Sequence, residues 1–283
     1  MALRSPLPSG SSAGLAPVLL ALLLLVAGCT TTSTTTTVSA AADPTPAPRA
    51  NVSTPSGETD AQRRARLRLE LAASYFDQGK TAVALDEVRQ ALAADPNHAE
   101  AYNLRGLIFM RLGDNGQAEE SFRRALSIDA GDSDTQHNYG WLLCQQRRYD
   151  EAERLFAQAA ANPLYAGRAK TQMAQGLCQA RAGRTAEAEQ TLARAYERDP
   201  ANPIVAYNLA AMAFRRGDME HARFYIRRLN NGDYANAESL WRGIRIERRL
   251  GDRVAMEQLA DQLRKRFPDA RELLAYERGA FDE

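Results

Sequence analysis

Glycine recurs along this chain at a fixed interval, and that interval restricts the possible fold more than any other feature of the sequence. The first two glycines of the series stand 34 residues apart, as do the two later neighbouring pairs, and one step of 70 residues separates the two groups. A period of this length is typical of solenoids, in which each helix pair buries its apolar face only by stacking on the next pair. The glycines of the series are Gly79, Gly113, Gly183, Gly217 and Gly251.

The step of 70 residues contains one further repeat. Arg147 stands 34 residues after Gly113, where the other repeats have glycine, and the next step to Gly183 is 36 residues. The two extra residues lie near 164–168. Glycine at this position allows the left-handed backbone conformation that ends the first helix of a repeat.

The residues around these glycines also repeat, and their pattern resembles that of tetratricopeptide repeats. The second repeat, for example, has Gly106 on its first helix and Ala118 and Phe122 on its second. Small residues on both helices let the two helices cross closely, while larger apolar residues fill the space around the crossing. We therefore predict an all-α tetratricopeptide-repeat superhelix with six helix-turn-helix repeats over 65–270 and a short capping helix over 271–283.

The beginning of the chain has the order of an export signal. Arg4 supplies a positive charge, residues 15–26 are apolar, and small residues precede Cys29. The segment ending at Cys29 resembles a bacterial lipobox. This resemblance implies a signal peptide over 1–28, a lipid attached to Cys29, and an anchor at the periplasmic face of the outer membrane, because Thr30 rather than aspartate follows.

Residues 29–64 are rich in threonine, alanine and proline and show no apolar periodicity. Such a composition predicts a flexible tether between the lipidated cysteine and the repeats. The formal net charge of the chain is only +1. This balance excludes the broad electrostatic attraction on which nucleic-acid binding depends.

Enzyme signatures are missing from the sequence. Gly79 and Lys80 resemble the end of a phosphate-binding loop, but Ser74 stands where that loop needs its first glycine. The three histidines do not form the HExxH pattern of a zinc protease, and no Cys/His cluster has metal-ligand spacing. We therefore predict a protein without catalytic activity, cofactor, metal or small-molecule substrate.

Two of the three cysteines lie within the repeats. Cys144 and Cys178 are 34 residues apart across the two-residue insertion, which places them on the first helices of adjacent repeats. In an oxidising compartment this arrangement favours a disulfide, and two buried free thiols are the alternative. On the chain-entropy model, closing a loop of this length stabilises the fold by about 3 to 4 kcal/mol.

The concave face of such a superhelix is lined by the first helix of each repeat. The residues predicted there are mostly apolar or aromatic, a composition that suits an exposed partner-binding surface, although each could instead belong to the core between repeats. A clamp for a C-terminal carboxylate is disfavoured, because Leu69 and Ala73 occupy positions that need polar donors. The candidate groove residues are Asn103, Leu107, Met110, His137, Trp141, Gln145, Met173, Leu177, Tyr207 and Phe214.

Four arginines stand close together in the last repeat. They predict either a solvated helix face or a docking site for an acidic partner segment or lipid headgroups. These residues are Arg242, Arg245, Arg248 and Arg249.

Two longer stretches resemble the type IV pilus biogenesis and stability lipoproteins, the pilotins of the pilus secretin. One is 138–165, with Trp141 and Cys144, and the other is 238–270, which begins ESLWRGIRIERR. The resemblance implies an outer-membrane lipoprotein scaffold that binds secretin subunits in its groove and promotes their localisation or assembly. The alternative is a lipoprotein regulator of another envelope complex, such as a cell-wall enzyme.

Overall fold

The computed structural model describes residues 57–281, and all regular secondary structure within that range is helical. The predicted signal peptide, Cys29 and most of the predicted tether lie outside the described residues. The helices are α1 (Asp60–Asp77), α2 (Thr81–Ala94), α3 (Ala99–Leu112), α4 (Asn115–Ile128), α5 (Ser133–Gln145), α6 (Tyr149–Ala161), α7 (Arg168–Arg181), α8 (Thr185–Arg198), α9 (Pro203–Arg216), α10 (Met219–Asn230), α11 (Ala237–Leu250), α12 (Arg253–Arg266) and α13 (Arg271–Glu277).

The first helix begins earlier than the sequence suggested. Thr59 caps α1: its hydroxyl accepts a hydrogen bond from the Gln62 backbone N–H at 3.2 Å, and the Gln62 side chain accepts one from the Thr59 N–H at 2.9 Å. This reciprocal capping satisfies two backbone donors that a helix start otherwise leaves open. The prediction that the tether extends to residue 64 is therefore corrected, because α1 already includes 60–64.

The repeated glycines end the first helices as predicted. Gly113, Gly217 and Gly251 follow α3, α9 and α11 with φ angles of 78°, 86° and 77°. Arg147, just after α5, has a φ angle of 62° and is the one non-glycine residue with positive φ in residues 57–281. The structure thus confirms that Arg147 occupies the glycine position of the third repeat.

Within each pair, a small residue on the first helix receives a large side chain from the second. A Cβ added to Gly106 would lie 2.4 Å from the Phe122 ring, and one added to Gly140 would lie 3.0 Å from the Phe156 ring. Both phenylalanines are fully buried. The close crossing predicted from the small residues is therefore present in the second and third repeats.

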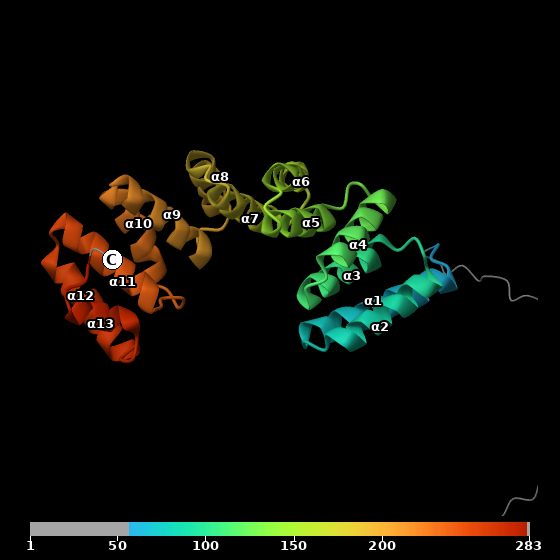
Figure 1. Ribbon diagram of the computed structural model, residues 1–283, viewed down its shortest axis with the longest axis horizontal. Helices are drawn as coiled ribbons and strands as arrows, with labels where there is room; N and C mark the ends of the chain where they lie inside the picture. Colours follow the sequence, from blue (N-terminus) through green and yellow to red (C-terminus); the bar gives the residue numbers. More distant parts are fainter. Residues whose placement is uncertain (1–56, 282–283) are drawn as a thin grey trace, which may run out of the picture. The chain divides into compact units, whose positions relative to one another are not determined.

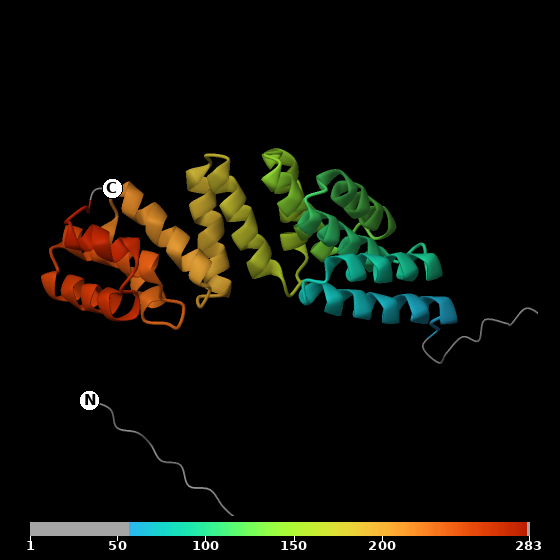
Figure 2. The same cartoon turned by 60° about the horizontal axis from the view of Figure 1, so that its bottom comes forward.

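Helix pairs follow one another in chain order from α1 to α12 (Figures 1 and 2). Each helix packs on the next, and first helices of neighbouring pairs also touch, for example α3 with α5 and α5 with α7. The short helix α13 packs on α11 and α12, which is the arrangement expected of the predicted cap. No helix in residues 57–281 has the length and apolar character needed to cross a membrane.

Candidate functional site

A pocket of about 250 Å³ opens between the first helices of the second, third and fourth repeats, and we call it the middle pocket. Six of the predicted groove residues line it: Leu107, Met110, His137, Trp141, Met173 and Leu177. Asn138, Lys170 and Ala174 complete the lining. These residues come from α3, α5 and α7, and most of the surface that they present is apolar. The middle pocket therefore suits an apolar side chain of a partner.

A disulfide joins two walls of the middle pocket. Cys144 of α5 and Cys178 of α7 are bonded, and their Cα atoms lie 5.9 Å apart. Both residues are buried, and each stands within three positions of a lining residue, Trp141 or Leu177. The bond fixes the separation of α5 and α7 and with it the width of the pocket.

One titratable group inside the middle pocket is kept neutral. Burial and the nearby Lys170 lower the pKa of His137 to about 4, and the imidazole Nδ1 lies 3.0 Å from the Thr171 hydroxyl. The imidazole is therefore uncharged at neutral pH. Lys170 is exposed and is the one formally charged residue among the lining residues at that pH.

The remaining predicted groove residues lie outside the middle pocket. Asn103 accepts a hydrogen bond from the Asn138 amide at 3.0 Å, and Gln145 is exposed on α5. Tyr207 lies in a separate pocket of about 310 Å³, where its hydroxyl hydrogen-bonds with Glu238. Phe214 is buried. The predicted groove is thus divided among distinct surfaces.

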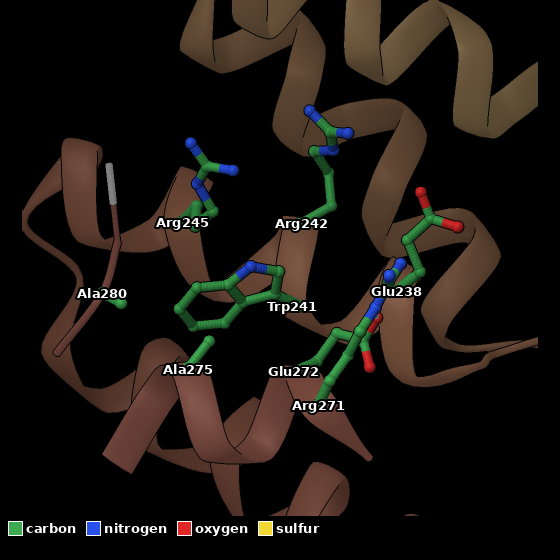
Figure 3. Close-up of a pocket in the computed structure, with 8 residues that line it drawn as sticks. All are labelled: Glu238, Trp241, Arg242, Arg245, Arg271, Glu272, Ala275 and Ala280. Atoms are coloured by element: carbon green, nitrogen blue, oxygen red, sulfur yellow. Dashed lines mark hydrogen bonds and ion pairs between the residues drawn. The ribbon is translucent and has the colours of Figure 1, made fainter. Parts of the chain in front are cut away.

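A pocket of about 470 Å³ lies between α11 and the capping helix, and we call it the cap pocket. Figure 3 shows its lining: Glu238, Trp241, Arg242, Arg245, Arg271, Glu272, Ala275 and Ala280. Sequence reasoning identified Arg242 and Arg245 but missed Trp241. The repeat period could have identified Trp241, because this residue stands 34 residues after the predicted groove residue Tyr207 and so occupies the equivalent position of the next repeat.

The four arginines of the predicted basic patch do not form one surface. The guanidinium of Arg249 lies 4.4 Å from the centre of the Phe214 ring, and those of Arg245 and Arg242 lie 5.3 and 5.7 Å from it. Arg248 instead stacks 3.9 Å from the centre of the Phe281 ring. No group of three or more metal-ligating side chains gathers within residues 57–281.

The helix pairs, the left-handed turns and the close crossings define a tetratricopeptide-repeat protein. Two family profiles, both described as tetratricopeptide repeat, match residues 69–133 and residues 109–174 and 179–242. The chain belongs to this class. It is 28% identical over 204 residues to the type IV pilus assembly protein PilF of Pseudomonas aeruginosa, a match that covers 72% of this chain and 81% of that relative.

Two solved structures extend the likeness to the fold. PilW, described as a widely conserved type IV pilus biogenesis factor, is 29% identical, with a TM-score of 0.66 over 75% of this chain and 97% of that one. The structure of Pseudomonas aeruginosa PilF is 26% identical, with a TM-score of 0.70 over 77% of this chain and 99% of that one. The chain is therefore homologous to PilF and PilW across nearly their whole solved length.

Proposed function

We propose that this protein is a lipid-anchored outer-membrane scaffold of type IV pilus biogenesis that binds secretin subunits and promotes their localisation or assembly. The observation that carries the proposal is the match to PilF, which extends over 81% of that pilus assembly protein. The similarity to PilW, over 97% of its solved chain, supports the same role.

The middle pocket is the proposed binding surface. Leu107, Trp141 and Leu177 offer apolar contacts from three consecutive first helices, so an apolar segment of a secretin subunit would be desolvated on several sides at once. The disulfide keeps two of these helices in place, which lowers the ordering cost of binding. Such a site binds a partner segment by packing and needs no chemical step.

The anchor at Cys29 raises the local concentration of the site. A lipidated cysteine with several acyl chains holds a protein stably at a membrane, because each buried methylene contributes about 0.8 kcal/mol. A tethered pocket meets membrane-bound subunits at a higher effective concentration than a free protein does. Secretin subunits would thereby be captured at the outer membrane and shielded while they assemble.

The experiment is a comparison of two matched variants in cells. Leu177 lines the middle pocket, whereas Leu67 is half-exposed on α1, away from that lining. Neither belongs to a buried core cluster. Leu177→Asp should reduce heat-resistant secretin multimers as strongly as deletion of the protein does, while Leu67→Asp should leave them unchanged.

Normal multimers and normal secretin location in the Leu177→Asp strain, with the variant present at its usual level, would contradict the proposal. Secretin location and multimer formation are followed separately, so that delivery is distinguished from assembly. Co-purification with a cell-wall enzyme in place of secretin would support the alternative role as a regulator of another envelope complex.

A further inference from the structure

One face of α7 carries an apolar wall of the middle pocket between two cationic side chains. Met173, Ala174 and Leu177 belong to this wall, Lys170 precedes them, and Arg181 follows them. Their spacing is i, i+3, i+4, i+7 and i+11, which places all of them along one face of a helix. With the rise of an α-helix, the two cationic positions are about 16 Å apart along α7.

Both cations stand beside the apolar lining. Lys170 itself lines the middle pocket, and the guanidinium of Arg181 lies 5.0 Å from the centre of the Trp141 ring, which forms another part of the lining. Stacking on an aromatic ring restricts the motion of a guanidinium. Arg181 therefore loses less conformational freedom when it binds an anion.

Neither cation is paired with a carboxylate in the described part of the chain. Within residues 57–281, Lys170 and Arg181 form no ion pair and no hydrogen bond with an acidic side chain. Asp134, at the start of α5, accepts a hydrogen bond from the Tyr165 hydroxyl at 2.8 Å and does not line the pocket. None of the lining residues is acidic. A carboxylate of a partner would thus meet each cation without competing with one of this chain's own.

We propose that the middle pocket selects a partner segment in which an apolar side chain stands between two acidic ones, in the order acidic, any, apolar, any, acidic. In an extended segment, alternate side chains point to one face, so the apolar residue and both carboxylates face the pocket together. The two acidic positions are then about 13 Å apart along the segment, and the long side chains of Lys170 and Arg181 span the remaining distance. Each carboxylate accepts a charge-assisted hydrogen bond from one cation.

This inference deepens the proposed function, because it rests on the middle pocket being the surface that receives the partner. Apolar packing alone distinguishes poorly between one apolar segment and another. Two cations beside the pocket favour a segment with acidic neighbours and repel one with basic neighbours. The charges therefore supply specificity, while the apolar lining supplies contact area.

The arrangement favours a peptide over an anionic membrane surface. The lining between the two cations is mostly apolar, so a continuous layer of phosphates would lose hydration against it without gaining partners. A peptide can place an apolar side chain there and keep its two carboxylates for the cations.

Trp141 reports on the middle pocket once the other tryptophan of the chain, Trp241, is replaced. The full chain carrying Trp241→Phe is purified in non-ionic detergent and titrated with the capped peptide Ac-Glu-Thr-Phe-Thr-Glu-NH2. Two matched peptides have glutamine or lysine in place of both glutamates. The glutamate peptide should bind about tenfold more tightly than the glutamine peptide and the lysine peptide most weakly, with differences that shrink as salt is raised.

Charge reversal locates the contact. Lys170→Glu combined with Arg181→Glu, in the same Trp241→Phe chain, should reverse the order, so that the lysine peptide binds more tightly than the glutamate peptide. Because this variant gains an affinity, misfolding does not account for the result. Arg253→Gln removes an exposed arginine of α12 and should keep the original order and affinities.

Equal binding of the three peptides, or an unchanged order in the charge-reversed variant, overturns the inference. A Trp141 response to phosphatidylglycerol vesicles without any response to the glutamate peptide also overturns it and assigns the two cations to a lipid surface. The proposed function fails on a different observation, which is normal secretin multimers in the Leu177→Asp strain. Equal peptide binding together with reduced multimers in that strain would reject the charge selection and leave the proposed function standing.

Discussion

Leu177 of α7 and Arg245 of α11 hold the same place in their repeats, six residues before the left-handed glycine that ends the helix. Trp141 holds that place in the third repeat, six residues before Arg147. The backbone presents all three positions on the first helix in the same way, yet the lining of the middle pocket is mostly apolar, whereas arginines and glutamates line the cap pocket. The repeat geometry therefore fixes where a contact lies, and the residue at that place decides which partner chemistry it accepts.

The two pockets are also held together differently. A disulfide between α5 and α7 fastens the middle pocket, whereas the cap pocket is closed by the packing of α13 on α11. A covalent bond restricts the unfolded chain as well as the folded one, while packing acts only in the folded state. Variants that remove one kind of restraint at a time therefore distinguish the two pockets.

Removing the disulfide should have the largest effect. Cys144→Ala combined with Cys178→Ala should lower the free energy of unfolding by about 3 to 4 kcal/mol, the chain-entropy value for the closed loop. Urea unfolding measures the loss. Partial unfolding should change Trp141 emission before Trp241 emission, and reductant should destabilise the wild type but not the double variant. Two free repeat thiols in the denatured, unreduced wild type would contradict the bond.

Acid should destabilise the middle pocket through His137. Its folded-state pKa of about 4 lies below the ordinary value of 6.5, so the unfolded chain takes up this proton first as pH falls. The free energy of unfolding therefore falls by up to about 3 kcal/mol as the pH drops from 6.5 to about 4. Above pH 6.5, His137 does not lower the stability. His137→Gln should lack this component in urea unfolding measured across the same pH range. Parallel curves for the two proteins would show that His137 does not titrate in this way.

Changing the side chain at position 177 should change the binding chemistry of the middle pocket. Leu177→Arg places a charge among mostly apolar lining residues, so it should disrupt capture of secretin subunits. Co-purification of secretin with the variant measures the outcome. Undiminished capture would show that the middle pocket does not hold the partner.

Replacing Arg147 by glycine should have the smallest effect. Arg147→Gly relieves the cost of a left-handed arginine, but glycine also gives the unfolded chain more freedom, so the net change should be under about 1 kcal/mol. Emission from both tryptophans should be unchanged. Urea unfolding measures the change in the free energy of unfolding. A much larger change would show that Arg147 makes a contact beyond its backbone role.

The repeat architecture was predictable because it depends on local signals that recur every 34 residues. This spacing alone assigned Arg147 to the glycine position of the third repeat, and its positive φ angle confirms the assignment. The start of α1 was not predicted, because its capping side chains, Thr59 and Gln62, lie in a segment whose composition is that of a linker. Six of the predicted groove residues line the middle pocket, as their register suggests. Asn103 and Gln145 do not line it: Asn103 accepts a hydrogen bond from Asn138, and Gln145 is exposed.

The cap pocket was beyond sequence reasoning for a different reason. Its arginines were visible, but their grouping depends on Phe214 of α9, which lies two helices earlier in the chain. Its other wall depends on how α13 packs, and no repeat pattern determines the packing of a capping helix.

We propose that the middle pocket contacts secretin subunits in the cell. The most direct measurement replaces Leu177 by the photo-crosslinking residue p-benzoylphenylalanine, with the same replacement at Leu67 as the matched control, and identifies the crosslinked partner after irradiation of living cells. A secretin adduct is expected from position 177 and none from position 67. An absence of secretin adducts at position 177, or equal adducts at both positions, would contradict it.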